Sequence, residues 1–164
     1  MKPLLIFGYG NPGRGDDALG PAFVDTVEAM GLELVECQTD MQLQVEHVTD
    51  LSNRRLILFV DADIACQHPF QLSEIRAERD DSYTSHAMTP QALLHAYGEV
   101  YHLSLPAAFL LRIRGDSFEL GEDLSSVAHS NLHEAVEQFR PLMDSVQEER
   151  WRDFAKQGAG VTYA

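Results

Sequence analysis

The chain alternates short apolar runs with segments in which apolar residues recur every three or four positions. Short runs are typical of buried strands, and the periodic segments are typical of helices with one buried face. The apolar runs predict strands at residues 4–7, 32–37, 56–62 and 107–113. Apolar and polar residues alternate over much of residues 70–75, which could form one further strand at an edge of the sheet.

Helical spacing predicts helices between these strands. They cover residues 18 to about 30, 43–51, 90 to about 101, and a long segment that starts at 123 or 125. Gly31 stands where the first helix would need a C-cap. Thr89 followed by Pro90 is an N-cap with a first-turn proline. Pro141 is expected to kink or end the last helix. Residues 118–120 could form a hairpin return or a loop.

The alternation of strands and helices predicts an α/β fold, a single-domain three-layer sandwich with a mostly parallel sheet. The length of 164 residues suits one domain. We expect that domain to cover residues 1–149 and a C-terminal tail to cover residues 150–164. Functional groups in such sheets gather at the carboxyl ends of the strands. This rule selects the loop after Phe7, the strand end near Glu36, and Asp61.

The charge and the apolar runs argue against several classes of partner. With 26 acidic and 12 basic residues the formal net charge is −14, which argues against binding to nucleic acid or anionic membranes. The longest apolar runs have five residues, whereas a membrane helix needs about 20. No signal peptide is recognisable at the start. Cys37 and Cys66 show no disulfide or CxxC spacing, so we expect a cytoplasmic protein with reduced thiols.

The loop after the first strand contains the pattern GxGxxG, formed by Gly8, Gly10 and Gly13. A strand before it, a helix after it and Glu36 on the next strand are the context of a dinucleotide-binding fingerprint. Asp16 and Asp17, however, stand where a pyrophosphate would lie, and like charges repel. A single acid is enough to cap the helix. The other carboxylate is therefore available for a different task.

Two residues are candidate companions for that carboxylate. Asp61 leaves the third strand at the same edge of the sheet, and His86 lies in the loop ahead of the Pro90 helix. Ligands of the type Asp17, Asp61 and His86 could leave open positions on zinc, nickel, manganese or iron. The same residues also have ordinary structural roles, as a cap, a turn residue and an exposed histidine.

Other arrangements compete with this set. His129 and His133 are four residues apart on the last helix, with Glu137 one turn further, and this geometry can bind a metal. A solvated helix edge explains the same spacing. Asp61 and Asp63 could work as an acid/base pair if they shared a strand face, but a turn expected after Ala62 would separate them.

Nucleophilic catalysis finds little support in the sequence. The chain has no GxSxG elbow. Cys37 and Cys66 have no catalytic signature around them and are expected to be small buried hydrophobes. Ser85 beside His86 is adjacent in sequence, which does not produce the required hydrogen-bond geometry.

Three separated motifs resemble the [NiFe]-hydrogenase maturation endopeptidases. GYGN, four residues and then DDALG, over residues 8–20, is similar to the family signature GxGN-x4-D[DE]GxG. Val60-Asp61-Ala62 at a strand end and Ser85-His86 before a helix follow in the same order. The resemblance covers about residues 4–140. The segments GNPGRGDDALGP, QLQVEHV and YTSHAMTPQALL look most like the subgroup that serves the bidirectional, NAD-coupled hydrogenase.

The resemblance implies an endopeptidase that removes the C-terminal extension of the hydrogenase large-subunit precursor once nickel has been inserted. Carried over from the family, the catalytic residues and nickel contacts are Asp17 (Glu in many relatives), Asp61 and His86. The precursor is then the partner and supplies the nickel. We expect no tightly bound cofactor of the chain's own, and no nucleic-acid or membrane partner.

Two positions depart from the family pattern. Ala18 stands where the family usually has glycine, and residues 38–42 lack the glycine-rich turn that many relatives carry after the second strand. Two other functions therefore stay open. One is a dinucleotide-binding oxidoreductase, and the other is a metallochaperone or docking protein that binds the precursor without shortening it.

Overall fold

The structure is a computed structural model, and it describes residues 1–80 and 87–157. Its centre is a five-stranded sheet with the strand order β2-β1-β3-β5-β4. The strands are β1 (Leu4–Tyr9), β2 (Val35–Asp40), β3 (Leu56–Asp63), β4 (Phe70–Ile75) and β5 (Ala107–Arg114). β4 runs antiparallel to its neighbour β5, while the other three pairings are parallel. This confirms the mostly parallel sheet, and it confirms β4 as an edge strand.

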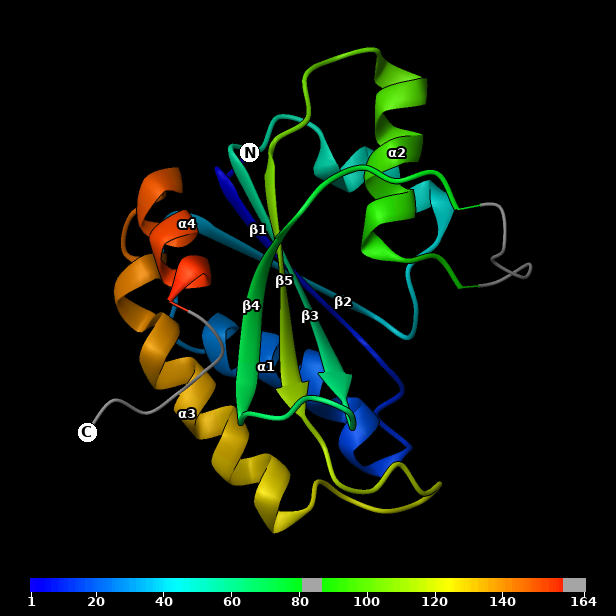
Figure 1. Cartoon of the computed structure of the whole chain (residues 1–164), viewed down its shortest axis with the longest axis vertical. Coiled ribbons are helices and arrows are strands. Elements are labelled where there is room, and N and C mark those ends of the chain that lie inside the picture. Colours follow the sequence, from blue (N-terminus) through cyan, green and yellow to red (C-terminus); the bar gives the residue numbers. More distant parts are fainter. Residues whose placement is uncertain (81–86, 158–164) are drawn as a thin grey trace.

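Helices cover both faces of the sheet (Figure 1). They are the 3-10 helices η1 (Gly15–Ala18) and η2 (Val45–Leu51), and the α-helices α1 (Leu19–Glu28), α2 (Pro90–Tyr101), α3 (Ser126–Met143) and α4 (Glu148–Lys156). α1, α3 and α4 pack on one face, and α2 packs with η2 on the other. The three-layer sandwich is thereby confirmed. No helix among the described residues is long and apolar enough to cross a membrane.

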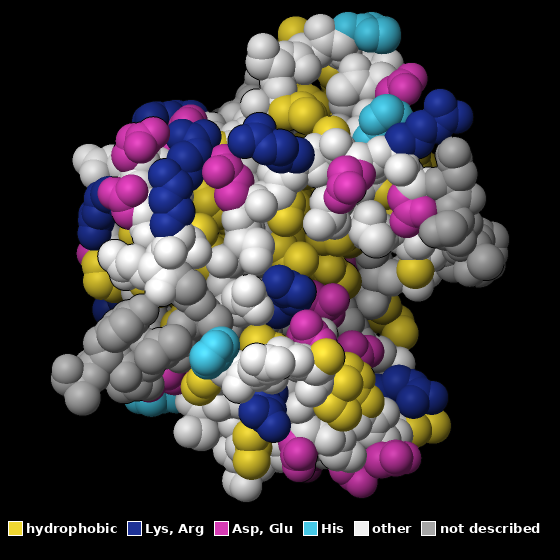
Figure 2. Space-filling view, in the orientation of Figure 1, with side chains coloured by type: hydrophobic (Ala, Val, Ile, Leu, Met, Phe, Trp, Pro, Cys, Tyr) yellow, Lys and Arg dark blue, Asp and Glu magenta, His cyan; other side chains and the backbone are white. Residues whose placement is uncertain are grey.

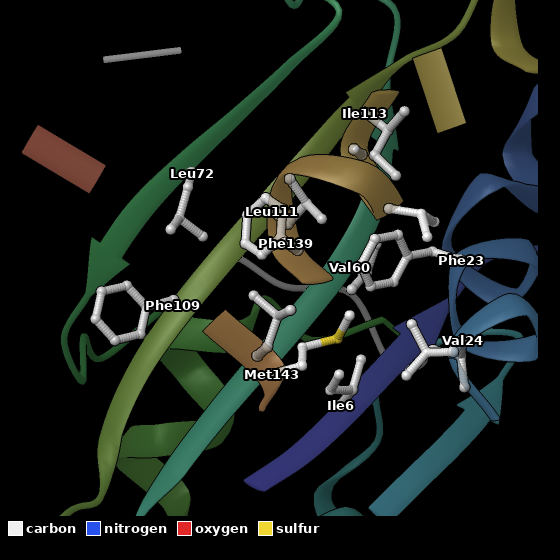
Figure 3. Close-up of a cluster of buried hydrophobic side chains, with 14 of the residues drawn as sticks. Ile6, Phe23, Val24, Val60, Leu72, Phe109, Leu111, Ile113, Phe139 and Met143 are labelled. Carbon is white, nitrogen blue, oxygen red and sulfur yellow. The ribbon is translucent and has the colours of Figure 1, made fainter. Parts of the chain in front are cut away.

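Alternation along the strands divides the core into two clusters. Ile6 and Val60 belong to the cluster under α1, α3 and α4, where Figure 3 shows them near Phe23 and Phe139. Phe7 and its odd-numbered neighbours on β1 and β3 pack under α2 and η2. Each fully buried large side chain contributes roughly 1.5–3 kcal/mol relative to exposure. The same alternation directs the odd-numbered polar residues at the carboxyl ends of β1 and β3 toward the α2 face.

β2 lies three residues later than the sequence predicts. The chain leaves α1 through a turn in which Gly31 has a φ of 63°, and Leu32 and Leu34 pack on the core from that turn. The strand itself is polar because it is an edge strand with partly exposed side chains. Glu36 is therefore near the start of β2, and Asp40 is at its carboxyl end.

Several other boundaries differ by a few residues. β1, β3 and β5 each run one or two residues further than expected, and a 3-10 helix precedes α1. Residues 118–120 form a loop rather than a hairpin return. Pro141 lies inside α3, which ends two residues later at Met143.

The expected boundary between residues 149 and 150 falls inside α4. Trp151 of this helix is completely buried, with its ring 5.7 Å from Phe109 and 5.8 Å from Phe139 between centroids. Residues 150–157 are thus part of the domain and not a tail.

Candidate functional site

The loop from Tyr9 to Ala18 is built to bring a helix start close to the strand ends. Gly10 has a φ of +147°, and a Cβ there would overlap the carbonyl oxygen of Asp17. At the start of α1, a Cβ on Gly20 would lie 2.6 Å from the carbonyl oxygen of Val60 on β3. Both contacts require glycine. η1 and the first turn of α1 therefore pack directly against the carboxyl ends of β1 and β3.

Asp16 is fully buried and connects this loop to the start of α3. Its Oδ2 accepts hydrogen bonds from the backbone N–H groups of Asp116 and Ser117 and from the Ser125 hydroxyl. Its Oδ1 accepts a fourth from Ser125 N at 2.7 Å. Burial alone would raise the pKa of this carboxyl, but these hydrogen bonds together hold it below its ordinary value of 3.8. Asp16 thus has a structural role.

Asp17 is the carboxylate left over, and it lies near Asp61. Its Oδ2 accepts a hydrogen bond of 2.8 Å from the backbone N–H of Asn11. The negative charge of Asp17 acts on Asp61, whose pKa it helps to raise. The structure therefore brings together two of the three residues expected to form the site.

Asp61 stands on the α2 face near the end of β3. Burial raises the pKa of its carboxyl to about 7, and the charges of Asp17 and Asp63 act in the same direction. Hydrogen bonds from Ala62 N (2.8 Å) and from the Tyr9 hydroxyl oppose this rise without cancelling it. A carboxyl of this kind exchanges its proton near neutral pH and can act as an acid or a base.

Tyr9 and Arg112 complete the surroundings of Asp61, and the sequence did not point to either. Burial and the charge of Asp61 raise the pKa of Tyr9 well above 10, so its hydroxyl stays protonated and donates a hydrogen bond to Asp61. Arg112 is the register partner of Asp61 on β5. It interrupts the apolar run from Ala107 to Ile113 in β5, which is the signal that could have identified it.

A second polar pair lies at the neighbouring strand end. Asp40 closes β2, and its Oδ2 lies 3.0 Å from Nε2 of the buried His47. The backbone N–H of Gln44 donates to His47 Nδ1 at 2.9 Å, so the proton of a neutral ring is on Nε2 and points to Asp40. This pair shapes the glycine-free loop after β2.

The remaining expectations for metal ligands can be stated separately. His86, like its neighbour Ser85, lies outside the described residues. His129, His133 and Glu137 are exposed on α3, and Glu137 forms an ion pair of 3.1 Å with Arg140. Within residues 1–80 and 87–157, no group of three or more His, Cys, Asp or Glu side chains could hold a metal ion.

Asp63 and the cysteines also have defined places. β3 continues through Ala62, so Asp63 is on the same strand face as Asp61, contrary to the expected break. Its carboxylate accepts from Ala65 N at 2.9 Å and faces Arg112. Both cysteines are free. Cys66 is buried, and burial raises the pKa of the Cys37 thiol to about 11, the opposite of what a nucleophile needs.

The dinucleotide interpretation does not fit this geometry. Glu36 lies at the opposite end of β2 from the glycine loop, and it forms an ion pair of 2.8 Å with the buried Arg54. It cannot bind a ribose next to Gly10. The four residues of η1 also separate the glycines from α1, so the loop does not lead directly into the helix N-terminus that a pyrophosphate requires.

Comparison with known proteins gives a clear result for the fold. No protein-family model and no curated protein sequence matches the chain. Solved structures do match it. The [NiFe] hydrogenase maturation protease HycI of Thermococcus kodakarensis KOD1 superposes with a TM-score of 0.71 and 17% identity, over 88% of this chain and 94% of that one.

Two further structures give the same answer. The hydrogenase maturating endopeptidase HybD of E. coli has a TM-score of 0.65 and 19% identity, over 87% of this chain and 94% of its own. The hydrogenase 2 maturation peptidase of Thaumarchaeota archaeon SCGC_AB-539-E09 has a TM-score of 0.62 and 24% identity, over 88% and 100%. This chain therefore has the fold of the hydrogenase maturation proteases over nearly its whole length.

Proposed function

We propose that this chain is an endopeptidase that removes the C-terminal extension of a [NiFe]-hydrogenase large-subunit precursor after nickel insertion. The observation that carries the proposal is the meeting of Asp17 and Asp61 at the carboxyl edge of the sheet, close enough for one charge to raise the pKa of the other carboxyl. The fold shared with maturation proteases supports it. So do the sequence motifs around both residues.

The chemistry follows from the type of side chain at this edge. Carboxylate oxygens from Asp17 and Asp61, with the imidazole of His86, would complete the coordination of a nickel ion that the precursor already holds. Such an ion can polarise the scissile carbonyl or lower the pKa of a bound water. We also propose that the precursor belongs to a bidirectional, NAD-coupled hydrogenase, because the three segments noted above resemble that subgroup.

The direct test is incubation of the purified chain with nickel-loaded and nickel-free large-subunit precursor, followed by intact-mass measurement. We expect only the nickel-loaded precursor to be shortened. Cleavage of both forms would contradict nickel recognition. Stable binding without any change in mass would instead identify a docking protein or metallochaperone, and tight binding of NADH or FAD would favour an oxidoreductase.

Histidine variants test the proposed nickel contacts in the same assay. His86→Ala should abolish processing, because the imidazole is the only nitrogen ligand of the set. The matched control is the double variant His129→Ala with His133→Ala, which removes two exposed imidazoles of α3 and should process normally. The reverse result would mean that the nickel contact belongs to α3.

A further inference from the structure

Arg112 is a charged residue in an interior strand of the sheet, next to the candidate site. β5 lies between β3 and β4, and Arg112 pairs in register with Asp61 on one side and Gln71 on the other. Ala108 and Leu110 precede it at strand spacing and pack in the cluster beneath α2. α2 covers the upper part of this face in Figure 1 and stops short of the arrowheads of β3 and β5. Arg112 therefore lies where the apolar layer ends.

The guanidinium of Arg112 uses few of its five N–H donors. Nη2 donates to the Ser73 hydroxyl at 3.3 Å. Nη1 forms a long ion pair of 3.9 Å with Asp63 Oδ2, beyond hydrogen-bond distance. Nε is buried and has no hydrogen-bond partner in the structure of the described residues. A buried donor without an acceptor destabilises the fold, so packing alone gives no reason for an arginine at this position.

The neighbouring carboxylates do not satisfy this arginine either. Asp61 takes its hydrogen bonds from Ala62 N and the Tyr9 hydroxyl. Asp63 accepts from Ala65 N. Between Arg112 and Asp61, both of which the structure describes, there is no ion pair, although the two face each other across adjacent strands. The Arg112 side chain is about one-third exposed, while its Nε is buried, so a ligand from outside would approach the exposed part of the side chain.

We propose that Arg112 is a binding residue for a peptide carboxylate that docks beside Asp61. The planar fork of a guanidinium matches a carboxylate with two parallel hydrogen bonds. The inference rests on the proposed peptidase function, and it adds a specificity element to it. Within the precursor, the carboxylate could be an acidic side chain near the scissile bond or the terminal carboxylate that cleavage creates.

A direct binding measurement tests the subsite without requiring cleavage. Side-chain ¹H–¹⁵N spectra of the full chain would follow the arginine Nε–H signals during titration with three small probes. N-acetylglycine supplies a terminal carboxylate, N-acetylaspartic acid α-amide supplies a side-chain carboxylate, and N-acetylglycinamide is the neutral control. We expect a saturable shift of the Arg112 signal with one or both carboxylates and none with the amide. The stronger probe identifies the source.

Arg55 provides the internal reference for that titration. It precedes β3 at the opposite edge of the sheet and has an exposed side chain. Equal shifts at Arg55 and Arg112, or no shift at Arg112, would overturn the subsite.

Kinetics with nickel-loaded precursor gives the second measurement. A charge-assisted hydrogen bond lost from binding corresponds to about 10- to 100-fold, so Arg112→Gln should raise KM by about that factor and leave kcat within about threefold. The KM of Arg112→Lys should lie between those of the unmodified chain and Arg112→Gln, because lysine keeps the positive charge but loses the planar fork of the guanidinium. Arg55→Gln should match the unmodified chain. Normal cleavage with an unchanged KM in Arg112→Gln would contradict the proposed subsite and leave the proposed peptidase function standing. Failure of the unmodified chain to cleave the precursor would contradict the peptidase function itself.

Discussion

Asp16 and Asp17 are adjacent in the chain, yet their carboxylates have different surroundings. Both oxygens of Asp16 accept hydrogen bonds from a segment about 100 residues away, and the side chain is completely buried. Asp17 is partly exposed and accepts from the nearby Asn11. One peptide bond thus separates a residue that holds the fold together from one that faces the candidate site.

This contrast predicts opposite phenotypes for two matched substitutions. Asp16→Asn places an amide NH₂ against N–H donors and should lower the free energy of unfolding by about 2–4 kcal/mol. Asp17→Asn can still accept from Asn11 and should change stability by less than about 1 kcal/mol, but it should stop processing. Urea denaturation and the cleavage assay measure the two effects. A stable Asp16→Asn, or a folded Asp17→Asn that processes normally, would contradict the assignment.

Asp61 predicts a pH-dependent stability. Its pKa is raised from 3.8 to about 7 on folding, so the folded state keeps a proton that the unfolded chain releases. Stability should therefore fall as the pH rises from about 4 to about 7, and stay level above that. Asp61→Asn has no carboxyl to ionise at this position. At pH 8 its free energy of unfolding, measured with urea, should exceed that of the unmodified chain by on the order of 2–4 kcal/mol, and below pH 4 this difference should disappear.

The control for Asp61 is Asp63→Asn, which carries the same substitution two residues along the same strand face. It keeps Asp61 and should therefore keep the fall in stability between about pH 4 and about pH 7. An Asp61→Asn variant that is destabilised equally at every pH would mean that the buried carboxyl is ionised in the folded protein. Processing should be lost in Asp61→Asn at all pH values.

At the scale of the elements, the interior strands and the edge strand β4 were predictable, whereas the other edge strand, β2, was misplaced. Buried strands such as β3 are continuous apolar runs because both of their faces are covered. β2 is an edge strand with polar, partly exposed residues, while the apolar Leu32 and Leu34 belong to the turn before it. The apolar pattern alone therefore placed the strand three residues too early.

The site was predictable to the extent that it depends on strand ends. Asp17 and Asp61 follow from the rule that loops at the carboxyl ends of parallel strands meet. Tyr9 and Arg112 depend on which strands are neighbours, and sequence patterns do not contain the order β1-β3-β5. The role of Asp16 depends on a contact with Ser125, which only the folded chain brings close.

α4 is the element whose contribution the sequence understated, and it gives a stability prediction. Among its charged residues are two aromatics, Trp151 and Phe154, and Trp151 packs between Phe109 and Phe139. Trp151→Ala should lower the free energy of unfolding by about 3–5 kcal/mol. Trp151→Phe should cost clearly less, because it keeps an aromatic ring and removes an indole N–H that has no acceptor among the described residues. Urea denaturation followed by circular dichroism compares the two, and equal losses would contradict this packing argument.

For the whole molecule, acidic side chains outnumber basic ones. The face shown in Figure 2 mixes acidic and basic side chains, although the net charge of the chain is −14. Arg55, Arg76 and Arg152 line a cavity of about 410 Å³ together with Glu74 and Glu148. Asp17, Asp40 and Asp61 lie at the carboxyl end of the sheet. A basic surface of a partner would therefore be attracted to the end that carries the candidate site.

The whole fold also predicts how the protein responds to removal of metal. The two apolar clusters hold the sandwich together, and the described part of the chain has no group of three or more His, Cys, Asp or Glu side chains that could hold a metal ion. We expect little metal in the purified protein and the same unfolding midpoint with and without a chelator. Nickel added to the protein alone should not rescue a nickel-free precursor. Stoichiometric metal that resists a chelator, with cleavage of nickel-free precursor, would make the chain an ordinary metallopeptidase.

The hydrogen bonds of Asp16 also have a consequence for the order of biosynthesis. Asp17 and Asp61 are both translated within the first 61 residues, but the loop before α1 is held by the backbone of residues 116, 117 and 125. On the ribosome, the amino-terminal part of the chain emerges first and can pair β1 with β3. The buried carboxylate of Asp16 lacks its full set of partners until Ser125 has left the exit tunnel. A nascent chain stopped before that point would contain both aspartates and still lack the full support that positions them, so the site becomes complete only after Ser125 has emerged.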